Sequence, residues 1–283
     1  MLASVFLLFQ TADPLRLPIG RPGETQVAPG ATMDTRTGKP AAAWAELAEG
    51  KPWVFLGESH ATAPHQRTEG EVVSALAKSG RKIAVGVEML TRPVQPVLDR
   101  YISGEIDEET FLKEADWKGQ WGFDFKFYRP LFAACRENKI PMVALNVPRP
   151  WVRAVGRGGL TALPPEARNE LPWPIEVGAG QHRKVFEGLL GGHPMTGTQG
   201  DNMLAAQTIW DEGMADTAIR WRRTHPVDTF VVVAGSGHML YGQGINLRVA
   251  RRVGQRGLNI LMIDGKEAAT VANGAADIVI APL

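Results

Sequence analysis

The sequence predicts an α/β fold in which helices flank a mainly parallel sheet. Runs of apolar residues rich in Val and Ile recur along the chain and do not alternate with polar residues, which is typical of strands covered on both faces. Amphipathic segments separate these runs. Alternation of strands and helices favours a parallel sheet.

The composition is that of a folded domain without a strong overall charge. The chain has 283 residues, of which 44% are hydrophobic, so it can bury a substantial core. Its 31 basic and 30 acidic residues leave a net charge of +1, which favours a small-molecule or peptide ligand over nucleic acid or an anionic lipid surface. Cys135 is the single cysteine, which excludes an intrachain disulfide, a CxxC zinc knuckle and a CxxCH haem attachment.

The N-terminal region divides into two segments. Residues 1–12 contain an apolar run too short to span a membrane, similar in length to the apolar part of a signal peptide but without basic residues before it. An apolar strand is the alternative. No cysteine follows the run, so we expect no lipobox. Residues 13–40 are dense in Pro and Gly, which predicts a tether or an extended arm on the domain.

Residues 41–283 are expected to form a single domain. Residues 156–200 within it are rich in Gly and Pro and too long for an ordinary connection, so we interpret them as an insertion over one edge of the sheet. This insertion could be a lid, a dimerisation arm or a surface excursion. The predicted strands lie at 52–60, 82–89, 141–149, 229–239, 258–264 and 277–283, and the helices near 41–50, 69–78, 97–117, 129–138, 202–223 and 247–255.

Polar side chains follow four of the predicted strands. In an open parallel sheet, ligands bind beyond the carboxyl ends of the strands, so we expect these side chains to meet in one cleft. A polar residue at a strand end can also be a helix cap or a surface group, but an acid among apolar residues is costly to bury unpaired. The residues are Glu58 and His60 after the first strand, Glu88 after the second, Asn146 and Arg149 after the third, and His238 after the fourth.

Two histidines of this set end a G-x-x-H motif, GESH at His60 and GSGH at His238. A glycine at the start of the motif permits a sharp turn and a close approach to a ligand. Two imidazoles and two carboxylates suit a divalent transition metal, or a general base whose tautomer a carboxylate fixes. His60, Glu88 and His238 are the candidate ligands for Mn, Co or Zn.

One face of the helix predicted at 202–223 carries polar groups. Gln207, Trp210, Asp211 and Met214 are spaced at i, i+3, i+4 and i+7, so they share a stripe. Gln207 and Asp211 are therefore expected to hydrogen-bond to an interior group, for which the loop of His238 is a candidate. A partly solvated edge of the stripe is the alternative.

Residues 117–128 are dense in aromatic side chains. This density is typical of a satellite core, but it could instead form the wall of a flat ligand, with Tyr128 offering a phenolate to ferric iron. Among the other histidines, His65 and His225 are expected at the surface. His182 and His193 lie in the insertion and could reach a ligand.

An ordered set of motifs resembles a known family. The segments FLGESH, VGVEML, VALNVPR, AAQTIWDEGMA and VVVAGSGHMLYGQGI, with the aromatic segment between them, are similar to the ChaN-like haem-binding uptake proteins of the Tiki and erythromycin-esterase superfamily. The similarity extends over about residues 41–249. It implies an α/β fold, a periplasmic or envelope-associated location, and haem binding for iron acquisition.

The leading hypothesis is therefore a haem-binding protein that assists iron uptake in the bacterial envelope, with Tyr128 and His182 as candidate cofactor ligands. A homodimer is one alternative for its assembly. A scaffold that retains the strand-end site without using it is another alternative for its function.

The competing hypothesis is an esterase or a peptidase. In the wider superfamily the paired GxxH motifs and acids are implicated in hydrolysis, which is metal-dependent in the Tiki proteases, and the resemblance carries these roles to Glu58, His60, Glu88 and His238. His60 or His238 would activate water, the two glutamates would orient or ligate, and Arg149 would stabilise the oxyanion.

Overall fold

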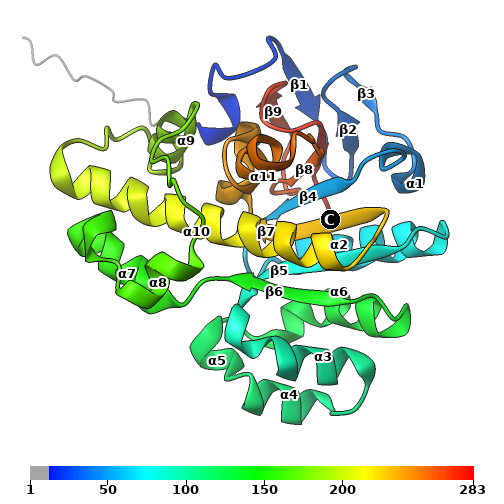
Figure 1. Ribbon diagram of the computed structural model, residues 1–283. Coiled ribbons are helices and arrows are strands. Elements are labelled where there is room, and N and C mark those ends of the chain that lie inside the picture. The colour runs from blue at the N-terminus through cyan, green and yellow to red at the C-terminus, as the bar shows by residue number, and fades with distance from the viewer. Residues whose placement is uncertain (1–12) are drawn as a thin grey trace, which may run out of the picture.

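A largely parallel sheet of eight strands forms the middle of the structure, a computed structural model that describes residues 13–283 (Figure 1). The strand order is β3-β2-β10-β8-β4-β7-β5-β6. All pairs from β10 to β6 are parallel, whereas β2 is antiparallel to β10 and β3. The strands are β1 (Glu24–Val27), β2 (Thr32–Asp34), β3 (Lys39–Pro40), β4 (Trp53–Glu58), β5 (Ile83–Thr91), β6 (Met142–Asn146), β7 (Thr229–Gly235), β8 (Leu258–Met262), β9 (Ala269–Ala272) and β10 (Ile278–Ile280).

Helices cover both faces of the sheet, and the predicted fold class is confirmed. In Figure 1, α10 runs across the front of the molecule and α3, α4 and α5 gather below β6. The α-helices are α1 (Trp44–Leu47), α2 (Ala63–Lys78), α3 (Gln95–Ser103), α4 (Glu108–Glu114), α5 (Trp117–Gln120), α6 (Phe125–Glu137), α7 (Arg149–Gly158), α8 (Pro165–Glu170), α9 (His182–Leu189), α10 (Gly197–Thr224) and α11 (Ile245–Val253). Short 3-10 helices are η1 (Pro14–Arg16), η2 (Arg92–Val94), η3 (Leu160–Ala162), η4 (Ser236–His238) and η5 (Leu240–Gly242).

The two faces of β4 explain why its apolar run is unbroken. Successive side chains of a strand point to opposite faces. Val54 and Leu56 belong to the core that contains α2, α3, α4 and α6, whereas Trp53 and Phe55 pack with α10 and α11. Both faces are therefore buried, as the non-alternating pattern predicted.

The helix predicted at 97–117 is divided into α3, α4 and α5. Gly104 ends α3 in the left-handed conformation, at φ 84°, which glycine adopts without steric cost. Asp107 then caps α4 by accepting a hydrogen bond from the backbone N–H of Thr110 at 2.8 Å. The prediction of one helix was wrong because these two local signals outweigh the apolar periodicity.

Residues 13–40 lie along the C-terminal part of the chain. β2 pairs with β10 in the main sheet, and β1 pairs with β9 in a separate two-stranded sheet. Arg21 adds an ion pair with Asp277 at 3.0 Å. The signal-peptide-like segment 1–12 lies outside the described residues. No helix within residues 13–283 is long and apolar enough to cross a membrane.

The Gly- and Pro-rich segment 156–200 contains η3, α8 and α9. Its apolar side chains Leu163, Leu171 and Ile175 are buried against α7 and α10 in a cluster of their own. His182 of α9 is buried as well, at 1% exposure. The segment therefore carries one of its polar side chains into the interior.

Candidate functional site

Glu58 and His60 form a pair at the carboxyl end of β4. His60 Nδ1 lies 2.7 Å from Glu58 Oε1, and the side chains are 33% and 0% exposed, respectively. The carboxylate therefore holds the proton on Nδ1 and fixes the tautomer. His60 Nε2 makes no hydrogen bond within residues 13–283, so it is the nitrogen that is free to act on a ligand.

Gly235, at the end of β7, lets His60 and Glu88 approach the same backbone position. A Cβ atom on Gly235 would lie 2.7 Å from His60 Cε1, 3.0 Å from His60 Nε2 and 3.6 Å from Glu88 Oε2. Any side chain at this position would displace the imidazole. Gly235 begins the second G-x-x-H motif, and the His60 ring ends the first. Gly235 therefore has to be a glycine, because the His60 ring occupies the space that a side chain would fill.

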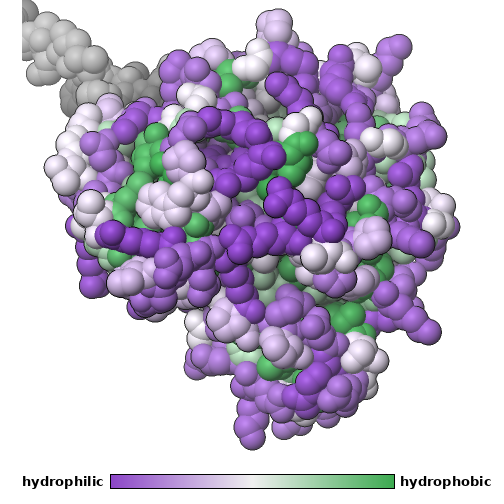
Figure 2. Space-filling model, viewed as in Figure 1, coloured by the Kyte–Doolittle hydropathy of each residue, from purple (hydrophilic) through white to green (hydrophobic). Residues whose placement is uncertain are grey.

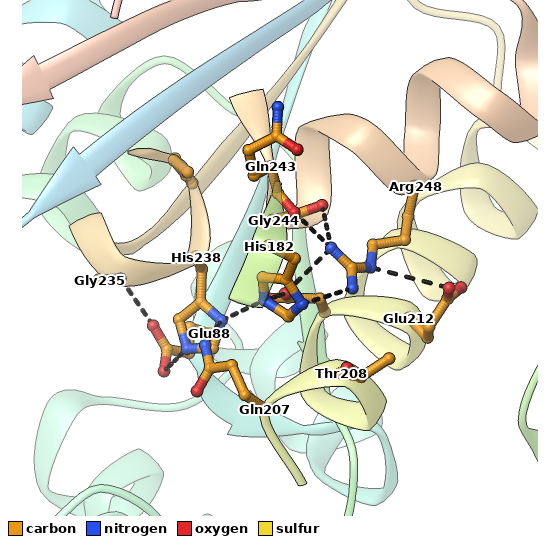
Figure 3. A network of polar contacts seen from close by, with 12 residues as sticks. Glu88, His182, Gln207, Thr208, Glu212, Gly235, His238, Gln243, Gly244 and Arg248 are labelled. Atoms are coloured by element: carbon orange, nitrogen blue, oxygen red, sulfur yellow. Dashed lines mark hydrogen bonds and ion pairs between the residues drawn. The ribbon is translucent and has the colours of Figure 1, made fainter. Parts of the chain in front are cut away.

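His238 is held between two buried carboxylates. Its Nε2 lies 3.3 Å from Glu88 Oε1 and its Nδ1 lies 2.6 Å from Asp211 Oδ1. Glu88 Oε2 accepts the backbone N–H of Gly235 at 2.7 Å, as Figure 3 shows. The Gln207 amide lies 3.0 Å from His238 Nδ1, so the predicted contact of Gln207 and Asp211 with the loop of His238 is confirmed.

The pKa values show that this histidine is charged. Burial lowers the pKa of His238, but Glu88 and Asp211 outweigh burial and raise that pKa to about 10. Burial raises the pKa of Glu88, but His238, His60 and the Gly235 N–H bring it down to about 2. The pKa of Asp211 is also lowered, since Arg248, His182 and His238 outweigh its burial. An imidazolium thus compensates the buried acids.

The network continues from Asp211 into α9 and α11. Asp211 Oδ2 lies 3.1 Å from His182 Nε2 and 3.3 Å from Arg248 Nη1, and Arg248 Nη2 lies 3.1 Å from His182 Nδ1 (Figure 3). His182 Nδ1 accepts a hydrogen bond from Arg248, and its Nε2 faces the Asp211 carboxylate in the interior. This placement gives no support to His182 as a haem ligand.

A second carboxylate lies behind the Glu58–His60 pair. The Gln66 amide donates to Glu58 Oε2, and Glu69 is 0% exposed on the same helix. Burial, followed by the negative charge of Glu58, raises the pKa of Glu69 well above its ordinary value, which favours the neutral form of this acid. Sequence reasoning missed both residues, although Gln66 and Glu69 share the buried face of α2 at i, i+3 spacing.

His65 is also part of this loop and not a surface residue. It is 1% exposed. Its Nδ1 accepts the Ser59 N–H at 2.9 Å and its Nε2 lies 3.1 Å from the Ile263 carbonyl. The prediction of a surface position was wrong, because the ring links the end of β4 to the end of β8. A cavity of about 480 Å³ adjoins the loop and is lined in part by Ser59, Thr62 and His65.

Most of the aromatic segment forms core, and Phe123 is the exception because its side chain is exposed. Tyr128 is 0% exposed, and its hydroxyl accepts the Ala61 N–H at 3.1 Å. Burial and the charge of Glu58 also raise its pKa, which disfavours the phenolate. The three tyrosines of the chain, Tyr101, Tyr128 and Tyr241, are 3%, 0% and 6% exposed. Tyr128 is therefore not presented as an iron ligand.

Asn146 ends β6 and Arg149 begins α7 just after it, and the two side chains make different hydrogen bonds. Arg149 donates to the carbonyls of Gly119 and Trp121 at 3.2 and 3.4 Å. Asn146 Nδ2 donates to the Glu88 carbonyl at 2.9 Å. Arg149 thus holds the backbone of Trp121, whose ring lies 4.7 Å from that of His60, and it does not pair with the Glu88 carboxylate.

The predicted metal set does not have the geometry of a metal site. Within the part of the chain that the structure describes, no group of three or more His, Cys, Asp and Glu side chains could hold a metal ion. The physical reason is that His238 gives both nitrogens to carboxylates. Glu88 in turn uses its oxygens for His238 and the Gly235 N–H. His238 therefore has no free lone pair, which leaves only His60 and Glu88 of the predicted set as possible ligands, fewer than the three protein ligands of a typical catalytic zinc site.

The structure is thus an α/β protein with a histidine–carboxylate cluster at the carboxyl ends of β4, β5 and β7. Residues 44–249 match the family model described as "Haem-binding uptake, Tiki superfamily, ChaN". The chain belongs to this family, and the resemblance stated from the sequence is confirmed.

Two relatives show how far the similarity extends. The structure of ChaN of Campylobacter jejuni, described with cofacial haem binding, matches with a TM-score of 0.67 and 19% identity over 88% of this chain and 95% of that chain. The chloroplastic protein RETICULATA-RELATED 5 of Arabidopsis thaliana is 24% identical over an alignment of 229 residues, and the match covers 75% of this chain. The match covers 31% of the plant protein, so this chain spans about a third of that relative.

Replacement of Glu88 by Gln tests the charged cluster. We expect Glu88→Gln to lower the free energy of unfolding at pH 7 by about 3–5 kcal/mol, because the His238 imidazolium loses a buried partner. Urea denaturation measures the change. Glu71→Gln, an exposed position on the neighbouring helix α2, is the control and should change stability by less than about 0.5 kcal/mol. Equal stability of the two variants would show that Glu88 is neutral.

The pH dependence of stability follows from the same pair. His238 has a pKa of about 10 in the folded state against 6.5, so its contribution is complete below pH 6.5 and is lost as pH rises through 10. Glu88 has a pKa of about 2 against 4.5, so its contribution is complete above pH 4.5 and is lost as pH falls toward 2. The stability difference between wild type and His238→Gln should therefore be largest between these limits and shrink toward pH 10. Denaturation curves at pH 6, 8 and 10 check this, and a constant difference would contradict it.

Proposed function

We propose that this chain binds haem or a similar iron porphyrin and assists iron uptake in the bacterial envelope. Membership of the haem-binding uptake family supports this proposal. The observation that carries it is the state of His60, which is partly exposed, bound to a carboxylate through Nδ1, and free at Nε2.

The residues around His60 fit an iron porphyrin. Histidines that ligate metals commonly donate the other ring N–H to a carboxylate, which fixes the ring and increases its basicity. Phe123 is 42% exposed and its ring lies 5.8 Å from that of His60, so it offers an apolar surface to a flat ligand. We therefore assign the iron-ligand role to His60 in place of Tyr128 and His182.

A hemin titration tests this assignment. Wild-type protein should shift the Soret band of hemin at micromolar concentration, and His60→Ala should weaken binding at least tenfold, since it removes the free Nε2. His225→Ala removes an exposed histidine at the end of α10 and should leave the spectrum unchanged. Tyr128→Phe should also leave it unchanged. A His60→Ala protein that retains the wild-type spectrum would remove His60 as the ligand, and absence of any shift would remove the function.

The same pair supports a second candidate, an esterase or a peptidase. A histidine held by a carboxylate at Nδ1 can take a proton from water at Nε2. Burial lowers the pKa of His60, but the hydrogen bond that His60 donates to Glu58 and the charges of Glu88 and Glu58 outweigh burial and raise it. The neutral ring is the base, so the rate of hydrolysis would rise as pH increases through this raised pKa.

Hydrolysis of p-nitrophenyl esters separates the two candidates. For a hydrolase we expect activity that His60→Ala lowers by at least a hundredfold, in the range of a removed general base, whereas His225→Ala has no effect. Replacement of Phe123 by Ala then distinguishes the two functions, because it should weaken hemin binding but leave a small ester substrate unaffected. Activity equal in wild type and His60→Ala would dismiss the hydrolase.

A further inference from the structure

A second cavity lies away from the histidine–carboxylate cluster, and none of its lining residues belongs to that cluster. It has a volume of about 810 Å³, within the usual range for small-molecule sites. α11, the turn that leads into β8 and the residues before β10 line most of it. The cavity therefore opens toward the amino ends of β8 and β10, whereas His60 follows the carboxyl end of β4.

The lining of this cavity is basic although the whole chain is nearly neutral. The net charge of the chain is +1, yet only one acidic side chain lines the cavity. Hydrophilic residues also dominate the surface over α11 (Figure 2). The charged lining residues are Arg21, Arg36, Lys51, Arg251 and Arg256, against Asp277.

Two of these cations have no acidic partner in the part of the chain that the structure describes. Lys51 and Arg256 form no ion pair within residues 13–283, whereas each of the other three pairs with a carboxylate and retains further N–H donors, because a guanidinium has five. The pairs are Arg21 with Asp277 at 3.0 Å, Arg36 with Asp34 at 2.5 Å and Arg251 with Glu176 at 2.6 Å.

The cavity also contains an uncharged hydrogen-bond donor, the side-chain amide of Asn259, and the backbone of a glycine, Gly242, lies beside it. Asn259 Oδ1 accepts a hydrogen bond from Asn246 Nδ2 at 2.8 Å, which orients the Asn259 amide. Its Nδ2 makes no hydrogen bond among the described side chains and lies 3.8 Å from the position of a Cβ on Gly242. Gly242, at φ 68°, has no side chain that would stand between this donor and a ligand.

We propose that this cavity binds a small molecule that carries a diphosphate or triphosphate group. Guanidinium groups match phosphate oxygens in a bidentate manner. The two unpaired cations need a ligand with more than one negative charge to be neutralised together. A cavity of about 810 Å³ also has room for an organic group attached to the phosphates.

Calorimetric titration with ADP and with pyrophosphate tests the proposal. Both probes should bind wild-type protein, and Lys51→Ala combined with Arg256→Ala should weaken both at least tenfold. The matched control combines Lys113→Ala with Arg223→Ala, which removes the same two charges from exposed positions outside the cavity and should change affinity less than twofold. No heat with either probe at millimolar concentration, or equal weakening in both double variants, would overturn the proposal.

A second variant tests the location without removing a cation. Ala250 lines the cavity from α11, and Ala250→Glu would place a carboxylate inside it. Binding of ADP and pyrophosphate should be abolished, while hemin binding at His60 should be unaffected. Unchanged ADP affinity in a folded Ala250→Glu protein would show that the phosphates bind elsewhere. The two sites share no residue. A protein that binds ADP and pyrophosphate but not hemin would therefore contradict the haem proposal and still support the anion site.

Discussion

The imidazolium of His238 between Glu88 and Asp211 is the interaction on which the rest of the site depends. It joins the end of β5, the residues after β7 and the helix α10. Two buried carboxylates would repel each other and lose their hydration, so one cation between them is the condition for all three elements to meet. Because the partners of His238 come from different parts of the sequence, the cluster also fixes the packing of α10 against the sheet.

The charged cluster determines the properties of His60. Glu88 is held on one side by His238 and on the other by the Gly235 N–H, so its negative charge stays near His60 without hydrogen-bonding to it. Glu58 holds Nδ1 directly, and burial and the charge of Glu58 raise the pKa of Glu69 behind it, which disfavours a second charge there. His60 is therefore a partly exposed imidazole with a raised pKa and one free nitrogen. The carboxyl groups that set its environment, Glu58, Glu69 and Glu88, are all more deeply buried than the ring itself.

Much of this arrangement could be predicted from the sequence, and the reasons are physical. Unbroken apolar runs identified the parallel strands, and polar residues after those strands had to meet at one edge of the sheet. Helical spacing placed Asp211 toward the loop of His238. Glu69 gave a weaker signal, because a glutamate on a helix is usually exposed.

The rest depends on contacts between distant segments. His182 lies in a Gly- and Pro-rich segment whose path no local pattern specifies, and only the three-dimensional structure shows that it reaches Asp211. Tyr128 ended an aromatic run, and whether such a run forms core or a ligand wall depends on which neighbours cover it. The metal prediction has no support from the described residues for a related reason: the residue types suit a metal, but His238 gives both of its nitrogens to Glu88 and Asp211.

The free Nε2 of His60 by itself does not distinguish a haem ligand from a general base, because both roles need a neutral imidazole that a carboxylate orients. The surroundings of the ring do distinguish them. A general base requires room for water and a substrate beside Nε2, and a group that stabilises the developing oxyanion. Arg149, the candidate for this group, gives two of its hydrogen bonds to the carbonyls of Gly119 and Trp121, so its guanidinium is held against the backbone beside the ring. Phe123 beside the ring is exposed and apolar, which costs free energy in water and is recovered when a flat ligand covers it. These two residues favour the porphyrin over the ester.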